Sequence, residues 1–283
     1  MNEENIYVNK KVLIYSLVGV SLLAGCGQNN ATQKEKTVVV EKEVDQIIEK
    51  PIKKPIETTK KDKRDLEEKK ESKITIENET TTAASIRAVM KKIGTEDILL
   101  VNKDHPLKDD YKVELRWLSS GREQVAACMY DELVQMLSDG STDGRDFVVS
   151  SGYRSPTYQQ RLWDETIRDW IRLGMSEEEA IKETSKSLAY PGESEHATGL
   201  AVDIVALDYQ DLDSQQQYTR ESIWLRENCH KYGFILRYPE GKEDITGIEY
   251  ESWHFRYVGK EIATCIMENG ITLEEFMVIK QKS

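Results

Sequence analysis

No aromatic side chain occurs between residues 28 and 82, and this absence limits where the chain can build a hydrophobic core. The segment is rich in lysine and glutamate, so it lacks the apolar area needed to offset the entropy lost on ordering. Pro51 and Pro55 also interrupt any long helix there. We therefore expect residues 27–83 to be a charged, largely disordered tether. Residues 84–283 then form one globular domain, long enough to bury an ample core.

The globular part is acidic. The first 83 residues hold 15 of the 39 basic and 15 of the 51 acidic side chains, so the remaining 24 basic and 36 acidic groups carry the whole net charge of −12. Phosphate binding depends on clustered lysine and arginine. We therefore expect no nucleic-acid partner.

An apolar run at residues 12–25 follows two lysines and is too short to cross a bilayer comfortably. It is typical of a signal peptide, and its end, Leu-Leu-Ala-Gly-Cys at residues 22–26, resembles the bacterial lipobox. That resemblance implies a lipoprotein signal peptide over residues 1–26, lipidation at Cys26 and an extracytoplasmic domain anchored to the cell membrane. A simple anchor helix with an incidental cysteine is the alternative, and it also places the remainder outside the cytoplasm.

The remaining cysteines are Cys128, Cys229 and Cys265, an odd number that allows at most one bridge within the chain. Cys128 and Cys229 occur in apolar helical patterns, so we expect both to be buried thiols. The sequence does not favour a disulfide among them and leaves the question open.

Hydrophobic periodicity and turn residues predict interspersed helices and strands without a regular βαβ repeat. The expected strands are residues 98–102, 147–150, 200–205, 234–238 and 249–257. The expected helices are residues 122–137, 158–173, 176–188, 220–232 and 262–268. This order indicates an α+β domain, with a small, mainly antiparallel sheet flanked by helices.

Two of the four histidines lie near carboxylates. His196 precedes Asp203 by seven positions, which would place the two on opposite faces of a straight strand. Gly199 between them allows a bend, so that His196 comes from a loop and Asp203 from the following strand. Glu251 precedes His254 by three positions, and this pair also needs a local bend to face one site.

Two imidazoles and one carboxylate match a catalytic zinc site that leaves the fourth position for water. Zinc lowers the pKa of such a water to about 7. A second carboxylate that is not a ligand then serves as general base, and Glu251 suits this role. On residue types alone, a histidine packed in a strand beside Trp253 is the more common arrangement, and the His196–Asp203 spacing by itself is a weak signal.

Three motifs in register resemble the zinc D,D-carboxypeptidases of the VanY type and their LdcB-like L,D-carboxypeptidase relatives. They are Ser151-Gly-Tyr-Arg-Ser155, Ser194-x-His-x2-Gly-x-Ala-x-Asp203 and Glu251-x-Trp-His254, and the match covers about residues 97–260. The resemblance implies one zinc at the sheet, with His196, Asp203 and His254 as its ligands. It further implies Glu251 as catalytic base and Arg154 as the group that binds the reacting carbonyl oxygen or the substrate carboxylate. The substrate-contacting residues would be Tyr153, Gln159 (or the adjacent Gln160), Ser194 and Trp253.

The implied function is removal of the C-terminal D-Ala from peptidoglycan stem peptides in the cell envelope, by a monomer. An L,D-carboxypeptidase acting on tetrapeptide stems and a non-catalytic zinc-containing peptidoglycan-binding module remain open. The tether disfavours a D,D-dipeptidase, whose substrate is cytoplasmic. A thiol hydrolase using Cys229 and His230 is disfavoured because adjacent helical residues point apart.

Overall fold

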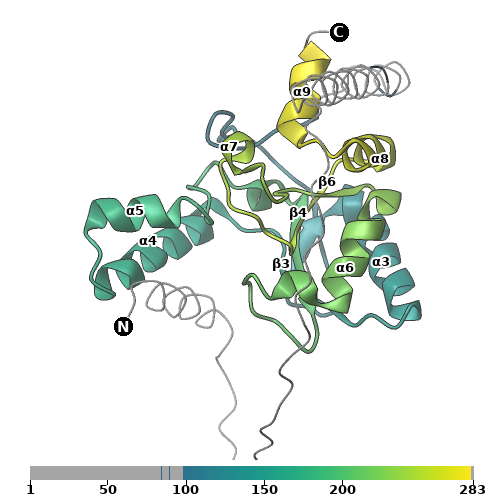
Figure 1. The fold of residues 1–283 in the computed structure, drawn as a ribbon, viewed down its shortest axis with the longest axis horizontal. Helices are drawn as coiled ribbons and strands as arrows, with labels where there is room; N and C mark the ends of the chain where they lie inside the picture. Colours follow the sequence, from purple (N-terminus) through teal and green to yellow (C-terminus); the bar gives the residue numbers. More distant parts are fainter. Residues whose placement is uncertain (1–83, 85–88, 90–97, 282–283) are drawn as a thin grey trace, which may run out of the picture. The chain divides into compact units, whose positions relative to one another are not determined.

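The computed structural model describes Ala84, Val89 and residues 98–281, and the fold is described for these residues (Figure 1). The expected signal peptide, its lipidation site Cys26 and the tether of residues 27–83 lie outside the described residues. Within the described part of the chain, no helix has the length and apolar character needed to span a membrane.

The centre of the domain is a four-stranded antiparallel sheet with strand order β3-β4-β6-β5. Its strands are β3 (Phe147–Ser151), β4 (Ala201–Ala206), β6 (His254–Tyr257) and β5 (Phe234–Leu236). A second antiparallel pair joins β1 (Leu115–Trp117) to β2 (Gln124–Ala126). The expected α+β class with small antiparallel sheets is therefore confirmed.

Helices occupy the connections between the strands. The α-helices are α3 (Ala127–Thr142), α4 (Pro156–Arg172), α5 (Glu177–Thr184), α6 (Arg220–Asn228), α7 (Glu243–Thr246), α8 (Lys260–Asn269) and α9 (Leu273–Gln281). Short 3-10 helices are η2 (Glu195–Thr198), η3 (Gln216–Tyr218) and η4 (Cys229–Tyr232). Ser155 caps α4 by accepting a hydrogen bond from the Tyr158 amide, and Ser176 with Glu179 forms a capping box on α5.

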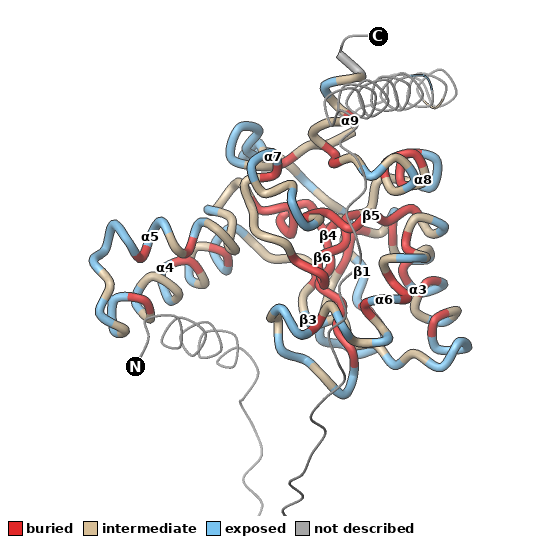
Figure 2. Tube along the Cα trace, in the orientation of Figure 1, coloured by how far each residue is buried: buried red, intermediate tan, exposed pale blue. Residues whose placement is uncertain are grey.

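One hydrophobic cluster lies between the sheet and helices α3 and α6. Met129, Leu133 and Met136 recur at helical spacing on α3, and they share this cluster with Phe234 of β5 and Phe255 of β6. Figure 2 shows the buried residues concentrated on the strands and on the inward stripes of these helices. Every residue of β4 is buried, so the side chains on both faces of this strand are packed against other parts of the domain.

A second cluster covers the other face of β5. Ile235 packs there with Ile262 and Ile266 of α8 and with Phe276 of α9. Because successive strand residues point to opposite faces, Phe234 and Ile235 belong to different clusters.

The helix predicted for residues 122–137 begins later and ends later than expected. Residues 124–126 form β2, because Val125 pairs with Arg116 of β1 and both Val125 and Ala126 are buried. The helix continues past the expected end at residue 137, through Gly140 to Thr142. The apolar spacing that suggested a helix includes a short strand, which forms a hairpin with β1.

Other predicted bounds also need correction. Residues 98–102 do not form a strand; only Asn102 makes an isolated bridge, to His105. The strand expected at 249–257 is restricted to β6, and the one expected at 234–238 ends at Leu236. The predicted helix 220–232 changes to 3-10 geometry at Cys229, and the helix expected to reach Leu188 ends at Thr184. Strand β1 and helix α9 were not predicted.

The three described cysteines are free thiols. Cys229 and Cys265 are buried. The prediction for Cys128 was wrong, because this side chain is exposed on α3 while its neighbour Met129 faces the core.

Candidate metal centre and active site

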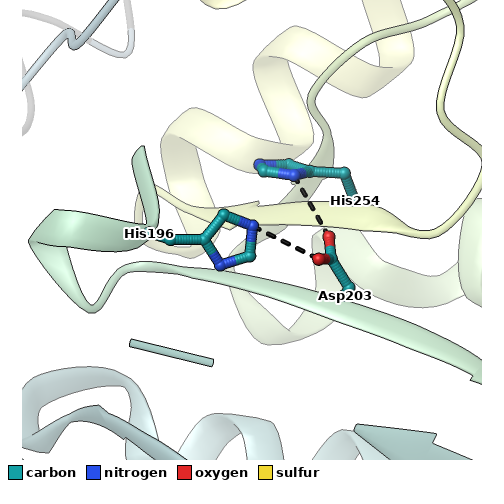
Figure 3. A group of neighbouring side chains, drawn as sticks. All are labelled: His196, Asp203 and His254. Carbon is teal, nitrogen blue, oxygen red and sulfur yellow. Dashed lines mark ion pairs between the residues drawn. The ribbon is translucent and has the colours of Figure 1, made fainter. Parts of the chain in front are cut away.

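Three elements bring His196, Asp203 and His254 together (Figure 3). His196 lies in η2, which ends at Gly199 with a left-handed φ of 71°, and the chain then enters β4 and reaches Asp203. His254 opens β6 directly opposite Asp203 in the antiparallel register. One ligand atom from each residue lies within 4.8 Å of the other two, and all three residues are buried. The expected bend at Gly199 is therefore present.

Backbone contacts fix the orientation of the His196 ring. Its Nδ1 lies 2.7 Å from the carbonyl oxygen of Gly152, which can only accept a hydrogen bond, so Nδ1 carries the proton. Nε2 is left with a free lone pair, 3.4 Å from Asp203 Oδ2. The amide of Gly152 donates to Glu123 Oε2 at 2.8 Å. A Cβ atom on Gly152 would lie 2.3 Å from the carbonyl oxygen of Gln124, so only glycine fits this position.

His254 presents one ring nitrogen to the cluster and the other to the protein interior. Its Nδ1 lies 3.2 Å from Asp203 Oδ1 and 3.5 Å from Glu251 Oε2, whereas its Nε2 faces Glu195 Oε2 at 3.6 Å. The ring is perpendicular to that of His196, with centroids 4.9 Å apart, and it packs against Tyr238.

Burial and neighbouring charges shift the pKa values of these groups. Burial lowers the pKa of His196 to about 4, and Arg154 acts in the same direction. Burial opposes the charge on His254, but Asp203 and Glu195 prevail and raise its pKa to about 9. Burial would raise the pKa of Asp203, yet His196 and His254 hold it well below its usual range. The cluster therefore keeps Asp203 ionised, as a metal-ligating carboxylate must be.

The donor atoms fit a zinc ion. Two imidazole nitrogens and a carboxylate oxygen are the usual donors of a three-ligand zinc site. His196 Nε2 and Asp203 Oδ1 are buried without a hydrogen-bond partner. Buried polar atoms are rarely left unsatisfied, and a cation between them would satisfy both.

Glu251 lies beside this cluster, in the turn before β6, so the expected local bend is present. Its amide donates to the Tyr238 carbonyl at 3.1 Å. Burial raises the pKa of its carboxyl group to about 8, although His254 acts in the opposite direction. A buried carboxyl group with a pKa near neutrality can both accept and return a proton.

Arg154 reaches the cluster from the segment between β3 and α4. Its guanidinium Nη1 lies 3.9 Å from Asp203 Oδ2, and its amide donates to the carbonyl oxygen of His196 at 3.2 Å. The guanidinium Nε is buried without a hydrogen-bond partner. The structure thus brings together all five residues expected to carry the chemistry: His196, Asp203, His254, Glu251 and Arg154.

The residues expected to contact substrate are buried or form hydrogen bonds within the domain. Gln159 is buried, and its side-chain amide donates to the carbonyl of Ala189 at 2.7 Å, while its Oε1 has no partner. The amide of Tyr153 donates to the Gln124 carbonyl. Ser194, two residues before His196, and Trp253, directly before His254, are both buried.

A buried ionic network behind His254 was not predicted. Glu195 Oε1 accepts hydrogen bonds from Arg237 Nε at 2.8 Å and Arg256 Nη1 at 2.6 Å, and Arg237 also binds Glu274 of α9. Two arginines at apolar strands could have indicated this network: Arg256 lies within β6, and Arg237 directly follows β5. Arginine is almost never fully buried without a partner.

Cys229 lacks the features of a nucleophile, because it is fully buried. Burial raises the pKa of its thiol to about 12, so the reactive thiolate is absent near neutral pH. Burial of Cys229 therefore further disfavours the thiol-hydrolase interpretation.

Comparisons with known proteins agree with this arrangement. The family model described as VanY, D-alanyl-D-alanine carboxypeptidase, matches residues 122–260. A D-alanyl-D-alanine carboxypeptidase of Enterococcus faecalis (strain ATCC 700802 / V583) is 39% identical over 193 residues, which are 67% of this chain and 70% of the relative.

Solved structures extend the similarity to the fold. A vancomycin-resistance D,D-pentapeptidase VanY variant in complex with Zn(II) is 38% identical with a TM-score of 0.58, covering 63% of this chain and 97% of that one. VanYB in complex with D-alanine-D-alanine is 39% identical with a TM-score of 0.59, covering 64% and 96%. The LD-carboxypeptidase LdcB is 36% identical with a TM-score of 0.54, covering 63% and 84%. The resemblance predicted from the three motifs is confirmed, and this chain belongs to the VanY D-alanyl-D-alanine carboxypeptidase family of carboxypeptidase hydrolases.

Proposed function

We propose that this protein is a zinc-dependent D,D-carboxypeptidase that removes the C-terminal D-Ala from peptidoglycan stem peptides outside the cytoplasm. The observation that carries the proposal is the buried group of His196, Asp203 and His254, with the Glu251 carboxylate 3.5 Å from His254 Nδ1. A non-catalytic binding module would have no need of a buried carboxyl group at this position. The solved relative that holds Zn(II) supports zinc as the metal.

The three ligand atoms would be His196 Nε2, an Asp203 carboxylate oxygen and His254 Nδ1. Zinc bound there supplies Lewis-acid polarisation of the scissile carbonyl and activation of a water molecule at neutral pH. The negative charge of Asp203 attracts a divalent cation and offsets the positive charge of the nearby Arg154. Burial of all three residues excludes bulk water and strengthens these interactions.

Glu251 carries the proton in this mechanism. Its carboxylate accepts a proton from the attacking water and returns it to the amino group of the departing D-Ala. Burial raises the pKa of Glu251 in the metal-free protein, and this favours holding the proton between the two steps. His254 and the turn at residues 251–253 keep the carboxylate beside the metal ligands.

Arg154 stabilises the negative charge on the carbonyl oxygen or binds the terminal carboxylate of the substrate. Its guanidinium, with an unpaired Nε and 3.9 Å from Asp203, is already directed toward the cluster. A buried contact to a developing oxyanion contributes about 3–4 kcal/mol to transition-state stabilisation.

We assign Tyr153, Gln159, Ser194 and Trp253 to the walls of the substrate pocket. Tyr153 adjoins Arg154 in the chain, and the unpaired Oε1 of Gln159 offers an acceptor. VanYB in complex with D-alanine-D-alanine supports a substrate ending in this dipeptide.

The proposal extends to the N-terminal residues. Residues 1–26 act as a lipoprotein signal peptide, Cys26 carries the lipid, and residues 27–83 tether a monomeric domain of residues 84–283 to the membrane. The lipobox-like residues 22–26 and the absence of aromatic residues in the tether support this organisation. Peptidoglycan as substrate agrees with an extracytoplasmic location.

The test is D-Ala release by the purified zinc-loaded protein from a pentapeptide stem and from a tetrapeptide stem. We expect release from the pentapeptide. Release from the tetrapeptide alone would assign the protein to the L,D-carboxypeptidases. Release from neither, with zinc bound, would favour a binding module.

A further inference from the structure

Glu195 is fully buried and divides its two carboxylate oxygens between different partners. Oε1 accepts hydrogen bonds from Arg237 and Arg256. Oε2 has no hydrogen-bond partner and faces His254 Nε2, which also has none, across 3.6 Å. Two unsatisfied buried polar atoms therefore point at each other next to the metal cluster.

The chemistry of the His254 ring makes this contact selective. Nδ1 faces Asp203 and Glu251, so Nδ1 is the nitrogen available to a metal. A neutral imidazole that ligates through Nδ1 must carry its proton on Nε2, and that N–H needs an acceptor. A carboxylate oxygen is an acceptor only, so Glu195 Oε2 favours this tautomer.

Two guanidinium groups hold the Glu195 carboxylate in place. Arg256 lies in β6, two residues after His254, and also donates to the carbonyl oxygens of Leu99 and Tyr257. Arg237 follows β5 and binds Glu274 through both of its Nη atoms. Both arginine side chains are almost completely buried, so the position of Oε2 is set by the two strands.

We propose that Glu195 is a positioning residue that orients His254 and keeps its Nε2 protonated, leaving Nδ1 free to coordinate the metal. The inference rests on the zinc site of the proposed function. Metal-ligating histidines commonly donate their second N–H to a carboxylate, and loss of such a partner lowers metal affinity about 10–100-fold. The η2 turn thus supplies one ligand, His196, and the support for another.

The decisive variant is Glu195→Gln, which keeps the shape of the side chain. A glutamine that accepts from the two arginines through its oxygen turns its NH₂ donors toward His254 Nε2. This arrangement favours the opposite tautomer, with the proton on Nδ1. The matched control is Glu274→Gln, which also removes one partly buried negative charge from Arg237 but replaces no residue of the metal cluster.

The first measurement is zinc affinity, by competition with a chromophoric chelator. We expect Glu195→Gln to weaken zinc binding by about 10–100-fold and Glu274→Gln to change it by much less, even where both lower the unfolding temperature equally. Equal losses of affinity in the two variants, or unchanged affinity in Glu195→Gln, would overturn the proposal. Glu195→Asp, which keeps the charge but withdraws the oxygen from His254, should also weaken binding and replaces the glutamine variant if that fails to fold.

A second measurement does not depend on zinc. The ¹⁵N shifts of the His254 ring in the metal-free protein, at a pH where the ring is neutral, report its tautomer. Without a metal, Asp203 and Glu251 compete by accepting from Nδ1–H. We therefore expect a larger fraction of the Nε2-protonated ring in the wild type and in Glu274→Gln than in Glu195→Gln. An equal fraction of the Nε2-protonated ring in all three proteins would refute the positioning role. Failure of the wild type to bind zinc would instead refute the proposed function.

Discussion

Asp203 Oδ1 lies 3.2 Å from His254 Nδ1 because the two residues are paired directly across the antiparallel strands β4 and β6. The register of the sheet therefore sets the distance between two of the three proposed ligands. A slip of one residue would turn one of these side chains to the opposite face. The third ligand, His196, depends instead on the η2 turn and on the Gly152 carbonyl.

Replacing His254 with alanine should release the metal. The variant removes a ligand itself, so its zinc dissociation constant should rise by more than the roughly 100-fold that is typical for loss of a supporting group. Zinc content after gel filtration, measured by mass spectrometry, checks this. His105→Ala is the control, because His105 is exposed and its ring forms a hydrogen bond with Asn102. A His254→Ala protein with full zinc occupancy would contradict the assignment.

Replacing Glu251 with glutamine should leave zinc bound and nearly abolish turnover. Glutamine cannot accept the proton from water, and loss of a general acid–base group costs about 10²–10⁴ in rate. Zinc content and D-Ala release are measured on the same sample. The exposed Glu240 offers a control as Glu240→Gln, which should keep normal activity. A near-normal rate in the Glu251 variant would remove this residue from the mechanism.

The stability of the metal-free protein should depend on pH through Glu251. Burial raises the pKa of this group from 4.5 to about 8, so its contribution to stability is fully present below pH 4.5 and is lost as the pH rises through about 8. One pKa unit corresponds to about 1.4 kcal/mol, which puts the upper limit of the loss at about 5 kcal/mol.

Chemical denaturation of metal-free wild type and Glu251→Gln across this pH range measures the effect. The stability of the variant relative to the wild type should increase between pH 4.5 and 8 and stay constant below 4.5. A difference that does not vary with pH would mean that Glu251 is not held in a desolvated position.

Gly152→Ala should weaken both folding and zinc binding. The added Cβ would lie 2.3 Å from the Gln124 carbonyl oxygen, and such overpacking costs about 1–3 kcal/mol. The backbone shift also moves the carbonyl that orients His196, so zinc affinity should fall by about 10-fold or more. Gly140→Ala, which would collide with Phe147 away from the site, should lower stability alone. Equal zinc affinity in the two variants would contradict the role of Gly152.

The metal cluster could be predicted from the sequence because its residues occur in short motifs with characteristic spacing. Gly199 indicated the bend that lets His196 and Asp203 converge, and the structure has this bend. The role of Gly152 in orienting His196 was not predictable, because the contact joins segments 44 residues apart. The function of Glu195 was hidden for the same reason, since its partners lie on β6 and beyond β5.

Short strands were the least predictable part of the fold. Strand β2 has only three residues, and their apolar spacing continues into α3, so only pairing with β1 distinguishes it from the helix. Helix α9 depends on packing of Phe276 against α8 and was missed. Cys128 is exposed although the adjacent Met129 is buried, so an error of one position in the predicted helix face exchanges core and solvent.

A zinc titration of the metal-free protein tests the central claim most directly. D-Ala release from a pentapeptide stem is followed as zinc is added, with bound zinc measured in parallel. Release should be absent without metal and should rise in proportion to occupancy, reaching a plateau at one zinc per chain. Full release by the metal-free protein, or no release at full occupancy, would contradict the account.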